Sequence, residues 1–296
     1  MKKMSKFEGY FTALITPFNN GVVDEPAYRD FVEWQISEGA SGLVPCGTTG
    51  ESPTLDHHEH MRVTELCVEV ASGRVPVIAG SGSNATAEAI ELTQHAQSAG
   101  ADGALLVMPY YNKPTQEGMY RHFMAIADSV DLPQIIYNIP GRCVVNMEVE
   151  TMAKLSQHNN IVGVKDATAD LALPTQVRSA CGDDFIQLSG EDATAIGFLA
   201  QGGHGVISVT ANVAPRKCAE FFSTWKTGDT SQALKLHQQL MPLHNGLFIE
   251  SSPIPVKFAL SLMGRCENEL RLPLCEPSDT NAKFIRSMLK ESGLLE

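Results

Sequence analysis

The chain has 296 residues, of which 43% are hydrophobic and 19% charged, a composition typical of a globular protein with a large core. Its formal net charge of -12 argues against a nucleic-acid-binding role, because phosphate binding needs clustered lysine and arginine. No apolar run suggests a signal peptide or a membrane span. The seven cysteines form no C-x-x-C pair, so we expect reduced, mostly buried thiols in a cytoplasmic protein.

Short β-branched and aliphatic runs alternate with helical patterns along the chain. The first helical pattern places Tyr28, Phe31, Val32 and Ile36 on one stripe, with Asp24 as its expected N-cap. Later helices are predicted at 57–72, 86–99, 115–129, 147–157, 169–180, 192–201 and 214–227. The predicted strands are Phe11–Thr16, Gly42–Cys46, Val75–Ala79, Ala104–Met108, Gln134–Tyr137, Ile161–Lys165, Phe185–Leu188 and Gly205–Val209.

Eight strands alternating with eight helices predict a parallel sheet with right-handed crossovers. We expect a closed (β/α)₈ TIM barrel over residues 1–228, because chemically rich residues follow several strands, as on a barrel rim. An open doubly wound sheet is the alternative, but no G-x-G-x-x-G opens the first helix. The tail, 229–296, has only helical patterns interrupted by prolines, and is predicted to form a small C-terminal helical domain.

Lys165 ends the run Ile-Val-Gly-Val-Lys, at the expected C-terminal end of the sixth strand. Alternation along a strand places Lys165 on the face opposite Val162 and Val164, which directs it into the barrel if the valines meet the helices. Burial would lower its pKa, and a neutral amine can attack a ketone to form a Schiff base. A structural ion pair, for example with Asp166, is the alternative for an isolated lysine of this kind.

Three further motifs follow the second, fifth and fourth predicted strands. In Gly47-Thr48-Thr49-Gly50-Glu51-Ser52, glycines flank two hydroxyl residues, a pattern suited to a carboxylate-binding nest, although a turn capped by Ser52 or Thr54 would also fit. In Tyr137-Asn138-Ile139-Pro140-Gly141-Arg142, the tyrosine can face Lys165 and the arginine can bind a carboxylate, although a core tyrosine and a salt bridge at the rim would also fit. Tyr110 and Tyr111 lie on a loop that suits an interface or a ligand wall.

The motifs GTTGES, PYYNKP, YNIPGR, VGVKDA, LSGED and GGHGVISVTANVAP occur in this order over essentially the whole chain. Together they resemble the dihydrodipicolinate synthase family, part of the class I pyruvate-dependent aldolase superfamily that also contains N-acetylneuraminate lyase. The resemblance implies a homotetramer of barrels, a dimer of dimers, without a cofactor or metal. It also implies condensation of pyruvate with L-aspartate 4-semialdehyde to 4-hydroxy-tetrahydrodipicolinate, in the diaminopimelate route to lysine.

The same resemblance implies roles for individual residues. Lys165 matches the Schiff-base lysine, and Tyr137 matches the tyrosine that relays protons. Thr48 matches the threonine that links this tyrosine to a second one, Tyr111, which the family supplies from an adjacent subunit. The residues that match substrate-binding or pocket-lining positions are Thr49 for the pyruvate carboxylate, Arg142 for the semialdehyde carboxylate, and Gly190 and Ile207 for the pocket wall.

Arg142 and the pair Thr48-Thr49 favour the synthase within the superfamily. The sialic-acid and sugar-acid lyases resemble this chain in the G-x-T-G-E motif, the tyrosine and the lysine, but not in these positions. A lyase that cleaves a sugar acid to pyruvate is the closest alternative. A keto-acid sensor that forms the same imine without turnover is a more distant one.

A lysine-binding regulatory site is implied at an interface between subunits. The matching positions are Ser52, Pro53, Leu55, His57, His60, Asn84, Glu88 and Tyr110. Pro53 departs from the alanine of some inhibited relatives and cannot donate an amide hydrogen bond. His57 and His60 could instead share a helix face in a zinc site, but the sequence offers no third ligand.

Overall fold

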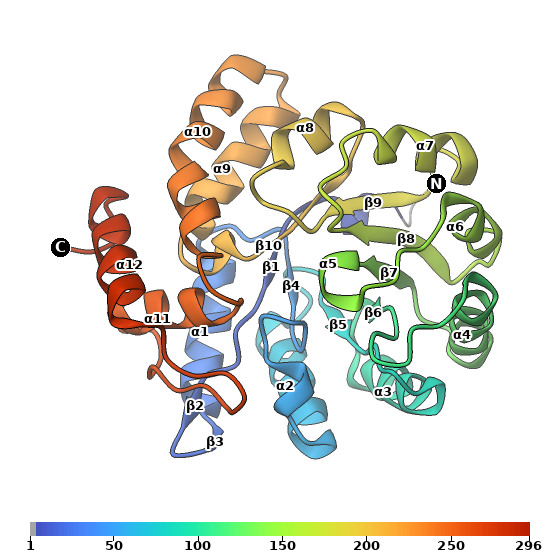
Figure 1. The fold of residues 1–296 in the computed structure, drawn as a ribbon, viewed down its shortest axis with the longest axis horizontal. Coiled ribbons are helices and arrows are strands. Elements are labelled where there is room, and N and C mark those ends of the chain that lie inside the picture. Colours follow the sequence, from blue (N-terminus) through green and yellow to red (C-terminus); the bar gives the residue numbers. More distant parts are fainter. Residues whose placement is uncertain (1–3) are drawn as a thin grey trace. The chain divides into compact units, whose positions relative to one another are not determined.

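The computed structural model describes residues 4–296 (Figure 1). These residues divide into two compact units. The first unit comprises Pro76–Ile207 with the N-terminal residues up to Glu8, and the second comprises Gly9–Val75 with Ser208–Glu296. Parallel strands occur in both units, and over the described residues their number is eight, as the sequence predicts. Within this described part of the chain, no helix has both the length and the apolar character of a membrane span.

The first unit carries parallel strands in the spatial order β10-β9-β8-β7-β6-β5, with all of β10 except its last residue, Ser208. Helices α3, α4, α6 and α7 follow one another along these strands, each in contact with the next (Figure 1). The strands are β5 (Ile78–Gly80), β6 (Gly103–Val107), β7 (Gln134–Asn138), β8 (Ile161–Asp166), β9 (Ile186–Ser189) and β10 (Gly205–Ser208). The helices are η1 (Met4–Phe7), α3 (Thr86–Ala99), α4 (Gln116–Ser129), α5 (Pro140–Cys143), α6 (Val149–Leu155), α7 (Leu173–Cys181) and α8 (Ala195–Ala200).

The second unit pairs β1 (Gly9–Ala13) with β4 (Gly42–Val44) in parallel and adds an antiparallel hairpin, β2 (Phe18–Asn19) and β3 (Val22–Val23). Helix α10 packs along α9, and α12 contacts both α10 and α11 (Figure 1). The helices are α1 (Glu25–Ser37), η2 (Ser52–Thr54), α2 (His57–Ala71), η3 (Thr210–Asn212), α9 (Pro215–Lys226), α10 (Thr230–Gly246), α11 (Ile254–Leu262) and α12 (Asp279–Glu291).

Local sequence signals explain where the helices begin. The Asp24 carboxylate accepts a hydrogen bond from the Ala27 amide at 3.0 Å, which confirms the predicted cap of α1. Tyr28, Phe31 and Val32, from the predicted stripe, are buried. Helix α2 begins with a capping box between Asp56 and Glu59, so Asp56 is its cap, and neither Ser52 nor Thr54 is.

Several predicted boundaries differ from the structure, and three of these differences have a clear structural reason. Strand β1 ends at Ala13 rather than Thr16, because the Ile15 amide donates to the Asn212 side chain at 3.2 Å. Strand β5 begins at Ile78 rather than Val75, because the Val77 amide donates to Asp102 at 2.7 Å. Helix α7 begins at Leu173 rather than at 169, because Ala169 has a φ of 61°.

The predicted division between residues 228 and 229 remains a prediction. The C-terminal helices α10, α11 and α12 are grouped with Gly9–Val75 in the second unit. Within this unit, α10 contacts α9 and α11 contacts η3. The tail therefore packs on parts of the chain that also belong to the predicted barrel domain.

Candidate active site

Lys165 lies near the end of β8, directly beside Tyr137 on β7 in the register of the two strands. Both side chains are buried, with Lys165 only 6% exposed. The Lys165 Nζ atom lies 4.1 Å from the centroid of the Tyr137 ring. The predicted orientation of the two side chains toward each other is therefore what the structure shows.

The surroundings of Lys165 favour its neutral form. Burial lowers the pKa of Lys165 to about 7; the nearby Arg142 charge lowers it further, and the Asp192 carboxylate opposes the shift. A lysine with its ordinary pKa would be almost entirely protonated at neutral pH. Here a large fraction of the amine is unprotonated, which is the form that attacks a carbonyl carbon.

Gly190, directly after β9, leaves the space that the Lys165 side chain occupies. A Cβ atom at position 190 would lie 2.9 Å from Lys165 Cε and 2.9 Å from the Ala167 Cβ atom. The Gly190 amide also donates to the Asp166 carbonyl at 2.6 Å, which holds the backbone close to β8. Only glycine fits here without displacing the lysine. The predicted pocket residue Ile207 is buried on β10 in the same unit.

Asp192 also belongs to this site, although the sequence does not indicate a role for it. Its side chain is 2% exposed, and its charge is the attraction that raises the pKa of Lys165 against the effect of burial. The motif LSGED contains it, but an acidic residue after a strand carries no specific signal by itself. Its effect on Lys165 depends on a distance that only the folded chain defines.

Arg142 lies in α5, a single turn that begins at Pro140, and its side chain is exposed. The Arg142 amide donates to the Ile139 carbonyl at 3.1 Å, and the Cys143 thiol reaches the Met108 carbonyl at 3.5 Å. The short helix is thereby tied to β7 and to the chain after β6. An exposed guanidinium whose charge influences Lys165 can bind an anionic substrate that approaches the amine.

Tyr110 and Tyr111 are held through their backbone by Asn84. The Asn84 Oδ1 atom accepts hydrogen bonds from the Tyr110 amide at 2.7 Å and the Tyr111 amide at 3.2 Å. The Tyr111 side chain is 90% exposed, so within one chain it does not pack into the site around Lys165. An exposed aromatic side chain on an anchored loop is suited to contact another molecule.

Thr48 and Thr49 belong to the second unit, in the turn after β4. The Gly50 amide donates to the Gly47 carbonyl at 3.1 Å, and the Glu51 amide donates to the Thr48 carbonyl at 3.2 Å. Thr49 is 3% exposed, whereas Thr48 is partly exposed. The compact turn that the glycines and hydroxyl residues predict is therefore present.

Nearly the whole chain matches one family of enzymes. The model of the Dihydrodipicolinate synthetase family matches residues 6–292. The chain belongs to this family. The 4-hydroxy-tetrahydrodipicolinate synthase of Bradyrhizobium diazoefficiens is 60% identical to it over 295 residues, which covers 100% of both chains.

Solved structures of the family have the same fold. The chloride-inhibited enzyme of Acinetobacter baumannii, complexed with pyruvate, is 44% identical with a TM-score of 0.95, over 97% of this chain and 99% of that one. The enzyme of Cyanidioschyzon merolae with lysine bound is 38% identical with a TM-score of 0.94, over 98% of this chain and 99% of that one. The predicted family and (β/α)₈ barrel are confirmed.

The residues that match the family's lysine site differ in exposure. Pro53 and His57 are exposed, and Leu55 and His60 are buried. Ser52, Asn84 and Glu88 are partly exposed, and Tyr110 is 39% exposed. Asn84, Glu88 and Tyr110 lie in the first unit, where the Ser83 hydroxyl donates to the Glu88 carboxylate. The other five residues lie in the second unit. Their role in binding lysine stays a prediction.

Cys46 follows β4, and His57 and His60 lie on α2. Burial raises the pKa of the Cys46 thiol to about 12, so this cysteine is not a reactive thiolate. His57 is exposed while His60 is buried, which separates their environments. Over residues 4–296, no group of three or more His, Cys, Asp or Glu side chains could hold a metal ion.

Proposed function

We propose that the chain condenses pyruvate with L-aspartate 4-semialdehyde through a Schiff base on Lys165, which yields 4-hydroxy-tetrahydrodipicolinate. The observation that carries this proposal is the buried Lys165, with its pKa lowered to about 7, facing Tyr137 at the end of β8. This reaction is the first committed step of the diaminopimelate route to lysine. It fits the names of the relatives that match the full chain.

The reaction begins when neutral Lys165 attacks the pyruvate ketone, whose carboxylate is held by Thr48 and Thr49. Loss of water gives an iminium ion, which withdraws electrons from the methyl group and allows its deprotonation to an enamine. The enamine carbon then attacks the aldehyde carbon of the semialdehyde while Arg142 holds its carboxylate. The substrate's own amine next attacks the imine carbon, which closes the ring and releases Lys165.

Proton transfer in this scheme belongs to Tyr137, Thr48 and Tyr111, which pass protons between the reacting atoms and bulk water. Tyr111 comes from an adjacent subunit in this proposal, which its 90% exposure in the single chain supports. In this proposal the working enzyme is a homotetramer, a dimer of dimers, in the cytoplasm. Residues 1–228 form the catalytic barrel and 229–296 a C-terminal helical domain.

A coupled assay with pyruvate and L-aspartate 4-semialdehyde tests the reaction directly. We expect turnover with this pair and none with N-acetylneuraminate as the substrate to be cleaved. Cleavage of N-acetylneuraminate without condensation would instead assign the chain the activity of the sugar-acid lyases. A trapped pyruvate adduct without turnover of any aldehyde would indicate a keto-acid sensor.

Replacing Arg142 by alanine is expected to raise the KM for the semialdehyde by about 10- to 100-fold, the usual effect of losing a charge-assisted hydrogen bond. Pyruvate should still form its adduct on Lys165. Because the Arg142 charge lowers the pKa of Lys165, adduct formation in the variant should move to higher pH. Steady-state kinetics with each substrate varied in turn measure these effects. The matched control is Arg121→Ala on α4. A wild-type KM for the semialdehyde in Arg142→Ala would show that Arg142 does not bind this substrate.

L-Lysine is expected to inhibit the wild-type enzyme, with the Glu88 carboxylate binding one of its ammonium groups. Replacing Glu88 by glutamine should raise the inhibition constant by about 10-fold or more, since a charged hydrogen bond is lost. Glu91→Gln, at an exposed position of the same helix, is the control and should keep wild-type inhibition. Initial rates over a range of lysine concentrations give the inhibition constant of the wild type and of each variant. An enzyme that millimolar lysine does not inhibit has no such regulatory site.

A further inference from the structure

Glu51, which ends the turn carrying Thr48 and Thr49, has an unfavourable backbone conformation. Its φ of 56° and ψ of 35° lie in the left-handed region, which side-chain-bearing residues seldom occupy. Its side chain is also buried, at 2% exposure for the residue. A buried carboxylate is stable only with partners that replace water. Tertiary contacts must therefore hold this residue in place.

Those contacts come from the C-terminal part of the second unit. The Lys257 Nζ atom, on α11, lies 2.5 Å from Glu51 Oε1, and the two side chains are 0% and 1% exposed. The other carboxylate oxygen, Oε2, accepts the Arg271 amide at 3.1 Å. Residues more than 200 positions away in the chain thus occupy both oxygens of Glu51.

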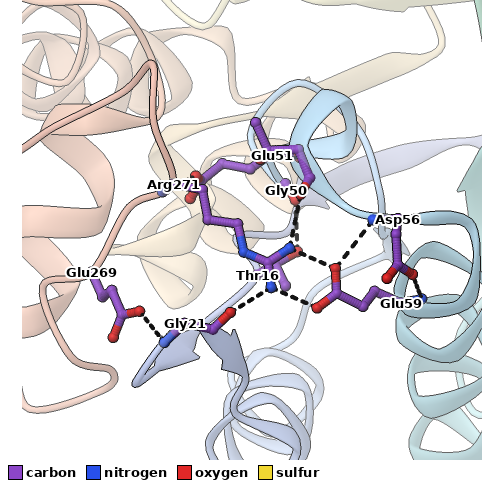
Figure 2. Close-up of polar contacts among 9 residues, drawn as sticks. Thr16, Gly21, Gly50, Glu51, Asp56, Glu59, Glu269 and Arg271 are labelled. Atoms are coloured by element: carbon purple, nitrogen blue, oxygen red, sulfur yellow. Dashed lines mark hydrogen bonds and ion pairs between the residues drawn. The ribbon is translucent and has the colours of Figure 1, made fainter.

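The side chain of Arg271 extends the same contacts to the segments around the turn (Figure 2). Its guanidinium forms two hydrogen bonds with the Glu59 carboxylate at 2.5 Å and donates to the carbonyls of Thr54 and Gly21 at 2.8 Å. Glu59 in turn accepts the Asp56 amide in the capping box of α2. Arg271 therefore joins η2, the start of α2 and the β2–β3 hairpin.

The aromatic ring of Phe18 packs against both cations of this cluster. Lys257 Nζ lies 3.9 Å and Arg271 Cζ 4.3 Å from the ring centroid, within the range of cation–π attraction. Nearby, the Glu269 carboxylate accepts the Asn20 and Gly21 amides at 2.9 Å and 2.6 Å. The hairpin is thus fixed to the same C-terminal segment.

The position of Glu51 sets the backbone of the catalytic turn. The Glu51 amide donates to the Thr48 carbonyl at 3.2 Å, and the preceding Gly50 carbonyl accepts the Thr16 hydroxyl at 2.7 Å. A Cβ atom at Gly50 would lie 3.1 Å from the Leu14 carbonyl oxygen, so the turn has little room to shift. A change at Glu51 would therefore be transmitted to Thr48.

We propose that Glu51, Lys257 and Arg271 are positioning residues, through which the C-terminal segment holds the Thr48-Thr49 turn in the conformation that binds the pyruvate carboxylate. This inference rests on the proposed function, in which that turn binds pyruvate. In this arrangement, none of the three residues contacts the substrate. Their loss raises the KM for pyruvate and also lowers kcat, because Thr48 takes part in the proposed proton relay, whereas Lys165 can still form its pyruvate adduct.

The double variant Glu51→Gln/Lys257→Met tests this role, because it removes both charges and keeps side chains of similar size. Each single change would leave one buried charge unpaired, which is strongly destabilising. In the folded double variant we expect the KM for pyruvate to rise by about 10-fold or more and kcat to fall, because Thr48 also belongs to the proposed proton relay, with the KM for the semialdehyde within about 3-fold of wild type. The control Glu33→Gln/Arg74→Met removes an exposed pair of the same unit and should leave all constants unchanged.

Thermal unfolding shows whether the double variant folds, and a folded variant with a wild-type KM for pyruvate overturns the proposal. If the double variant does not fold, Arg271→Lys tests the role of Arg271 instead. This variant keeps the hydrogen bond from the residue 271 backbone amide to Glu51 and loses the guanidinium contacts. An unchanged KM for pyruvate would contradict the role of Arg271. We expect about a 3-fold rise in that variant. Borohydride trapping separates the two proposals. A wild-type enzyme that forms no pyruvate adduct on Lys165 refutes the proposed function, whereas a normal adduct with unchanged pyruvate dependence in the variants refutes the positioning role alone.

Discussion

Replacing Lys165 by methionine is expected to lower kcat by at least ~10³-fold, because the variant has no amine to form the covalent intermediate. Borohydride treatment with pyruvate, followed by mass spectrometry, should show an adduct on Lys165 in the wild type and none in the variant. Lys154→Met, at an exposed position on α6, is the control and should retain both adduct and activity. An adduct that persists in Lys165→Met would place the chemistry on another amine.

The same lysine predicts how adduct formation depends on pH. Its pKa is lowered to about 7, and only the neutral amine attacks the ketone, so the rate should level off above pH 7. Below that value the neutral fraction falls tenfold per pH unit, so the rate at pH 5 should be about 100-fold lower. Because burial disfavours the charged lysine, Lys165→Met should unfold at the same temperature as the wild type or higher. A thermal unfolding midpoint of Lys165→Met well below that of the wild type would mean that its lost activity reflects misfolding.

Replacing Tyr137 by phenylalanine is expected to lower kcat by about 10²- to 10³-fold, the usual contribution of a positioned proton donor and acceptor. The ring next to Lys165 Nζ is retained, so the cation–π contact and the burial of the lysine persist, and the adduct should still form slowly. Single-turnover measurement of adduct formation, alongside kcat, tests both statements. Tyr120→Phe on α4 is the control, and near-wild-type kcat in Tyr137→Phe would assign proton transfer to another group.

Local sequence patterns predicted much of this fold correctly. Strands β4, β7, β8 and β10 begin at the predicted residues, and α3 has the predicted bounds. These predictions succeed because the hydrophobic periodicity of a strand or a helix is a local property of the sequence. The hairpin β2–β3 was not predicted, since each of its strands has only two residues. Boundaries failed where distant side chains, Asn212 and Asp102, took backbone amides away from the sheet.

The sequence alone determined the order of the eight barrel strands and the main helices between them, the family, and the candidate reactive amine, Lys165. It did so because hydrophobic periodicity and short motifs are read along the chain. The tertiary structure determined the protonation of that amine, because burial, together with Arg142 and Asp192, brings its pKa to about 7. It also showed that Gly190 makes room for the lysine and that Lys257 neutralises Glu51. Desolvation and charge interactions depend on distances in space, which residues far apart in the sequence acquire only when the chain folds.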